Sequence, residues 1–228
     1  MDKQGIDYLK KYSATVQVLS IHELTDPTVL PAAWLQLLSQ QEEERIAQVL
    51  LLWQPFQSEL ENTLGYLREN LRSVDLIHQA NSGYSLVYGI QNDNKKMAYY
   101  EGRNPLSKNS SEHVRKHWNN MPAKLSAFYE ELHNGWYYFA SESMGLAPVE
   151  SWSFLGDDEW GIVEELGELN FSLDTMLAVY PNGMGDYVCF DVSVPGGESI
   201  LWWHTKAPRR NIDFWQVVDI WTHIGMTN

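Results

Sequence analysis

The sequence contains a single cysteine, Cys189, and no run of 18 or more uninterrupted apolar residues. One thiol cannot form an internal disulfide, and residues 1–20 show no basic stretch followed by an apolar run of the kind found in secretory signals. No segment is therefore predicted to cross a bilayer. These absences exclude a secreted, disulfide-stapled scaffold and predict a soluble, cytoplasmic protein with no membrane partner.

Basic residues are missing from a long interval in the second half of the chain. No Lys or Arg lies between Lys124 and Lys206, whereas 14 Asp or Glu do. Residues 1–110 carry 13 acidic and 10 basic residues, a net of −3, whereas residues 111–228 carry 17 and 6, a net of −11. A chain with a total charge of −14 repels phosphate backbones. We therefore expect no nucleic-acid partner.

The 228 residues, 44% of them hydrophobic and 13% aromatic, are sufficient for a well-packed core and exclude a disordered chain. In the first half, alternation predicts a strand at 15–21, and three- and four-residue spacing of apolar residues predicts helices at 31–55 and 56–71. The apolar runs 84–88 and 97–100 flank a turn and predict a β-hairpin.

The Gly-, Pro-, Ser- and Asn-rich segment 102–111 is the expected boundary between an N-terminal helical and hairpin extension, residues 1–110, and a second part, residues 111–228. That second part has a predicted helix at 121–132 and a last helix that Asp213 can cap. Between them we expect an acidic helical turn at 157–169 and strands at 152–155, 176–180, 187–192 and 200–204. The order predicts an α+β fold with a single, mostly antiparallel sheet flanked by helices.

Three stretches of the second part, taken in order, resemble the SMI1/KNR4 family, also called the SUKH superfamily. The first is Met121-Pro122 with the helix that ends at His133-Asn134-Gly135, and the second is Met144-Gly145-Leu146-Ala147-Pro148. The third runs from Ala178 through Asn182-Gly183-Met184-Gly185-Asp186 to Asp191 and is followed by Trp202-Trp203-His204. The chain departs from the family pattern at Met121, where Leu is usual, and at Thr205, where an acidic residue is usual.

This resemblance covers residues 111–228 and implies an α+β fold without catalytic activity. In bacteria it implies an immunity protein that binds and neutralises a toxin, whereas eukaryotic members resemble regulators of cell-wall synthesis. We therefore expect a protein that is not an enzyme, that needs no cofactor or metal, and whose partner is a cognate toxin.

The candidate chemical groups agree with a binding role. Cys189 lies in an apolar run without an adjacent base, which is typical of a buried, inert thiol. The pair His113 and His117 has helical spacing but lacks the surrounding motif of a metal site, and His204 on a predicted strand is more typical of a packed residue than of a ligand. In the turn before Asp186, two glycines favour a tight hairpin. Asp186 either holds that turn by accepting its backbone N–H groups or is presented to a partner.

The acidic interval is the feature that points to a partner with a basic surface, because opposite charge steers association and aromatic anchors prolong a complex. Some of the aromatic candidates must belong to the core. The predicted partner-binding residues are Trp136, Trp152, Asp157, Asp158, Glu159, Trp160, Glu164, Glu165 and Asp186.

Two other functions remain open from the sequence. A regulatory scaffold, like the cell-wall members of the family, would normally carry long disordered flanks that this composition does not show. A carbohydrate-binding or carbohydrate-hydrolysing domain is suggested by the 10 Trp and the clustered carboxylates. The carboxylates, however, lie close together on one segment, which is typical of a solvated face.

Overall fold

The computed structural model describes residues 1–107 and 110–228 and has an α+β fold, as the sequence predicts. Residues 108–109, within the expected boundary segment 102–111, lie outside the described residues. The α-helices are α1 (Lys3–Tyr12), α2 (Ala32–Leu38), α3 (Glu42–Trp53), α4 (Glu61–Asn70), α5 (Glu112–His117), α6 (Ala123–Ala127), α7 (Gly161–Leu166) and α8 (Phe214–Thr227).

The described strands form two antiparallel sheets instead of the single sheet expected from the sequence. The first sheet has the order β1 (Gln17–Leu19), β2 (Leu71–Gln79), β3 (Gly83–Gln91), β4 (Met97–Arg103), β5 (Trp136–Tyr138) and β6 (Ser143–Leu146). The second has the order β11 (Lys206–Arg209), β10 (Ser199–Trp203), β9 (Tyr187–Asp191), β8 (Met176–Pro181) and β7 (Ser153–Phe154).

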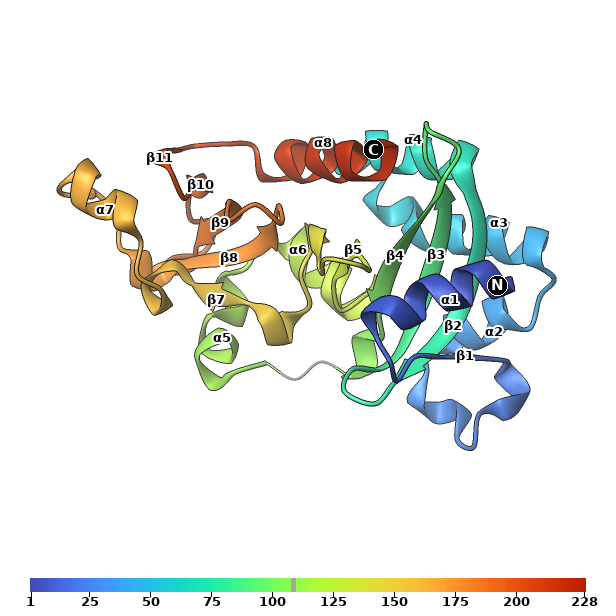
Figure 1. Cartoon of the computed structure of the whole chain (residues 1–228). Helices are drawn as coiled ribbons and strands as arrows, with labels where there is room; N and C mark the ends of the chain where they lie inside the picture. The colour runs from blue at the N-terminus through green and yellow to red at the C-terminus, as the bar shows by residue number, and fades with distance from the viewer. Residues whose placement is uncertain (108–109) are drawn as a thin grey trace.

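The first sheet is buried on both faces, as Figure 1 shows for α1 on one side and for α2 and α3 on the other. Side chains of a strand alternate between the faces. Tyr99 accordingly packs with Leu9 of α1, whereas the neighbouring Tyr100 belongs to the large core formed with α2, α3 and α4. The predicted hairpin is present, because β3 pairs with β4 through Tyr88 and Tyr100.

The first sheet also crosses the boundary expected at residue 110. Strand β4 pairs with β5, where Glu101 lies opposite Tyr137. The main core likewise contains residues from Leu30 to Met226. The two parts of the chain thus share a sheet and a core.

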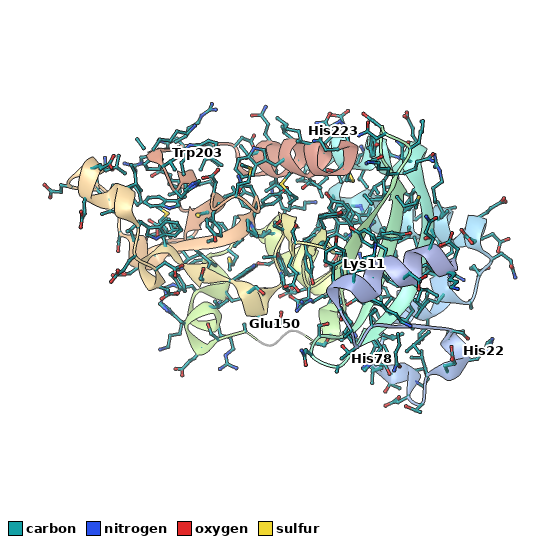
Figure 2. All side chains as sticks on the ribbon, in the orientation of Figure 1. Lys11, His22, His78, Glu150, Trp203 and His223 are labelled. Atoms are coloured by element: carbon teal, nitrogen blue, oxygen red, sulfur yellow. The ribbon has the colours of Figure 1, made fainter. Side chains whose placement is uncertain are left out.

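In the second sheet, β8, β9 and β10 match three of the predicted strands, whereas β7 is shorter than predicted. Helix α8 covers one face: Phe214 packs on Phe190, and Trp221 lies 6.0 Å from Trp203, which Figure 2 shows beside this helix. The other face is covered by Trp160, whose ring lies 5.3 Å from that of Trp202. Both faces of β10 are therefore packed.

Several helix boundaries differ from the sequence predictions. The helix expected at 31–55 is divided into α2 and α3. Gln41 is the N-cap of α3, and the three glutamates in the first turn of α3 stabilise this new N-terminus through the helix dipole. Helix α4 begins only at Glu61, where Asp219 of α8 accepts the N–H groups of Asn62 and Thr63 at 2.9 and 2.8 Å. That carboxylate caps α4 from a distant helix, which spacing within α4 cannot reveal.

The two sheets meet where the chain leaves β6. Ala147 donates its N–H to Val179 O of β8 at 2.9 Å, and Tyr129 and Trp152 both donate to Ala147 O. The buried Asn134 accepts from Val149 N at 3.0 Å and donates to Glu150, which Figure 2 places between the two sheets. These contacts satisfy the backbone of the connection and fix the sheets to one another.

Replacing Asn134 by alanine is expected to destabilise the fold by about 1–3 kcal/mol, because Val149 N–H is left buried without an acceptor. Urea unfolding measures this loss. The exposed Asn119 provides the control: Asn119→Ala should stay within about 0.5 kcal/mol of the parent protein. Equal losses in the two variants would contradict the role of Asn134 at the junction.

Candidate functional site

The best candidate for a contact surface is the acidic segment, residues 155–175, which contains α7. It lies at one end of the molecule, where α7 projects beyond the second sheet (Figure 1). Exposed carboxylates occupy most of its length: Asp157, Asp158, Glu159, Glu164, Glu165, Glu168 and Asp174. Within the described residues, none of these seven makes a salt bridge.

Local structure holds the acidic segment against the sheet. Trp160 is half-buried and donates its indole N–H to Leu155 O at 2.7 Å. Asp157 accepts from Phe154 N at 2.8 Å and so fixes the start of the segment. The predicted residues Asp157, Asp158, Glu159, Trp160, Glu164 and Glu165 therefore come together on one projecting element.

Two of the expected aromatic anchors are buried and are not available at the surface. Trp136 is only 3% exposed and stacks on Tyr100 with ring centroids 4.5 Å apart. Trp152 is 8% exposed and is held at the junction by its bond to Ala147 O. Burial of both indoles is a correction to the sequence prediction. Trp136 is covered by Trp53 of α3 and Tyr88 of β3, and Trp152 by Trp118 and Tyr129 at the junction.

Asp186 is also buried, which favours its interpretation as a residue that holds a turn. It accepts from His204 N at 3.1 Å, from His204 Nδ1 at 2.7 Å and from Asn182 Nδ2 at 2.9 Å. The backbone N–H groups of the turn go instead to Asn182 Oδ1, which accepts from Met184 and from Asp186 itself. The expected contact of Asp186 with a partner is thus replaced by a bond between neighbouring strand ends.

Burial raises the pKa of Asp186, but the hydrogen bonds from His204 and Asn182 outweigh it and hold the pKa below its usual range. The carboxylate stays charged and accepts bonds from the end of β10.

The histidines and the cysteine lie where packing explains them. His113 stacks on Phe154 at 4.0 Å, and His117 Nδ1 lies 3.0 Å from Val192 O. Cys189 is fully buried, and burial raises the pKa of its thiol well above the usual value. In the described part of the chain, no three His, Cys, Asp or Glu side chains are grouped as metal ligands.

Sequence reasoning missed a buried carboxylate at Glu101 in β4. Its Oε1 accepts from Ser85 Oγ at 2.6 Å and from Gln79 Nε2 at 3.0 Å, and Arg103 lies 3.8 Å away. Burial raises the pKa of Glu101 although Arg103 lowers it. The alternation of Tyr99, Glu101 and Arg103 could have indicated this residue, but the predicted strand ended at residue 100.

A second missed group is His133, which is fully buried against Trp53 and Tyr88. Tyr88 Oη accepts from Trp53 Nε1 at 3.1 Å and lies 2.6 Å from His133 Nε2. Burial lowers the pKa of His133 to about 3, so the imidazole is neutral near pH 7. Together with Glu101, this places the strongly perturbed groups inside packed layers, where they contact other side chains of the protein.

The lowered pKa of Asp186 generates a pH-dependent prediction. Because the folded-state pKa is below the unfolded value, the carboxylate stabilises the fold fully above about pH 4 and progressively less as the pH falls through its folded value. Asp186→Asn should cost about 1 kcal/mol near pH 7 and less near pH 3, as measured by urea unfolding. A cost that is the same at both pH values would contradict the prediction.

Cys189 provides a report on global unfolding. Its thiol is buried with a raised pKa, so a thiol reagent should modify the native protein only at the rate at which the second sheet opens. In concentrated urea the modification should be immediate. Rapid labelling of the native protein would show that β9 is not buried as described.

Comparison with known proteins identifies no relative of this chain. No protein-family model, curated protein or solved structure matches the chain. In the part of the chain that is described, every helix is too short or too polar to span a bilayer. The functional interpretation therefore rests on the residues themselves and on the resemblance of residues 111–228.

Proposed function

We propose that the protein is a binding protein of the SMI1/KNR4 immunity type, which occludes a basic toxin in the cytoplasm and performs no chemistry of its own. The supporting observation is the acidic segment, where seven exposed carboxylates lie on one projecting element without a basic partner among the described residues. Carboxylates without basic partners in their own chain can form charge-assisted hydrogen bonds with lysines and arginines of another protein.

The charge is concentrated in this segment because several carboxylates elsewhere in the interval have internal partners. Glu198 binds Arg210 at 2.8 Å, Asp186 binds His204, and Asp191 accepts from Ser193 N at 2.8 Å. An unpaired single-sign field accelerates association with a complementary surface by about 10–1,000-fold. The rate of association, more than the lifetime of the complex, should therefore depend on these side chains.

Trp160 is the remaining aromatic candidate at the contact surface. Its ring is half-buried between Tyr187 and Trp202, which holds the exposed edge in a fixed orientation. Rigid aromatic side chains near the centre of an interface contribute most to the lifetime of a complex. We assign Trp160 this role and the surrounding carboxylates the role of steering.

The experiment is co-expression and co-purification with the product of the neighbouring gene, followed by association kinetics at two salt concentrations. Glu164→Lys combined with Glu165→Lys should slow association about tenfold or more, because both carboxylates are exposed on α7. Raising the ionic strength should reduce the difference from the parent protein.

The matched control reverses two exposed glutamates outside the acidic segment, Glu69→Lys with Glu131→Lys, and changes the net charge equally. This variant should associate much faster than the α7 variant. A neighbouring gene product that is harmless, or that is equally toxic in the presence of this protein, would overturn the immunity function. Equal rates for the two variants would refute steering by the acidic segment.

A further inference from the structure

A surface hollow of about 500 Å³ lies between turns of the two sheets, away from the acidic segment. Its walls come from α1, from the turns that follow β3, β5 and β8, and from the C-terminal end of α8. Figure 1 shows α7 at the far end of the molecule from this part of α8. The volume falls within the range of small-molecule sites, about 300–1,000 Å³.

Two pairs of hydroxyl groups line the hollow. Tyr8 Oη and Tyr138 Oη lie 2.5 Å apart, and Ser141 Oγ and Ser143 Oγ lie 2.7 Å apart. In each pair one hydroxyl donates to the other, so the pair keeps one hydrogen to donate and several lone pairs to accept. The hollow therefore offers both donors and acceptors without a full charge at these positions.

The amide side chains at the rim serve a different purpose. Asn182 accepts from Met184 N and from Asp186 N, and Asn92 accepts from Lys96 N at 2.9 Å while donating to Asn228 O at 2.8 Å. These bonds fix the turns after β3 and β8. These two walls of the hollow are therefore held in place by side-chain hydrogen bonds.

Strained backbone supports a functional interpretation of this place. Glu142 and Met144 have φ of 49° and 53°, although neither is glycine. Gly183, with φ of 79°, faces Ser143 so closely that a Cβ would lie 2.5 Å from Ser143 Oγ. Positive φ values at residues other than glycine are unfavourable and cluster at functional sites. Here they bring the turn after β5 against the turn after β8.

We propose that this hollow binds a neutral polyhydroxylated compound the size of a mono- or disaccharide. Sugar hydroxyls both donate and accept, as the two pairs do, and Met97, Met144 and the tyrosine rings offer apolar surface to the C–H groups of a sugar. Lys96 is the one charged side chain among the described lining residues. Its positive charge disfavours a cationic ligand, and a single lysine is a weak binding site for an anion. The site is independent of the proposed toxin binding.

The test is an NMR titration of the full chain with glucose, with cellobiose and with sodium sulfate as the anionic probe. The amides of Gly183 and Gly225, which both line the hollow, should shift saturably with a sugar. Tyr138→Phe should weaken this binding about fivefold to tenfold, because it removes one hydroxyl of a pair and keeps the ring. Combined Ser141→Ala and Ser143→Ala should weaken it at least as much.

Tyr84→Phe serves as the matched control, because Tyr84 is half-buried in β3 outside the hollow, and it should bind like the parent protein. Circular dichroism verifies that each variant is folded, and Tyr138→Phe decides alone if the serine variant is not. Three results would overturn the proposal. The first is the absence of a saturable shift with either sugar up to about 50 mM, a concentration far above millimolar dissociation constants. The second is equal sugar affinity in Tyr138→Phe and Tyr84→Phe. The third is a shift caused by sulfate but by neither sugar.

Discussion

The hydrogen bonds around Ala147 join the two sheets, and both candidate sites depend on the resulting arrangement. Ala147 donates its N–H to Val179 O of β8, and the carbonyl oxygen of Ala147 accepts from Tyr129 and Trp152. A buried backbone segment is stable only when its polar groups are paired, so the sheets cannot shift independently without breaking these bonds. The acidic segment covers the outer face of the second sheet, and the hollow lies between turns of both sheets.

The two surfaces are chemically distinct. The acidic segment presents exposed carboxylates without salt bridges around a fixed indole at Trp160, which suits a large cationic partner. The hollow presents paired neutral hydroxyls within rigid turns, which suits a small neutral ligand. Two groups with shifted pKa values, Glu101 and His133, are enclosed by packing and contribute to the core.

Local patterns predicted the elements whose signals lie within a few residues. The hairpin of β3 and β4, the strands β8 to β10 and the cap of α8 by Asp213 were predicted because apolar alternation or one capping residue is enough to define them. Helix α1 and strand β2 were missed: β2 follows α4 without a break, and the predicted helix at 56–71 ended at the first residue of this strand. Spacing alone could not reveal that Asp219 starts α4 from another helix.

The sequence by itself determined the fold class, the inert burial of Cys189 and the position of the acidic interval, because these follow from composition and short-range pattern. Only the tertiary structure decided that Trp136 and Trp152 are buried, that Asp186 binds His204, and that hydroxyl groups from α1, β5 and the following turn share one hollow. Each of these depends on contacts between residues far apart in the chain. Such contacts form only when distant segments pack in the tertiary structure, and no local propensity encodes them.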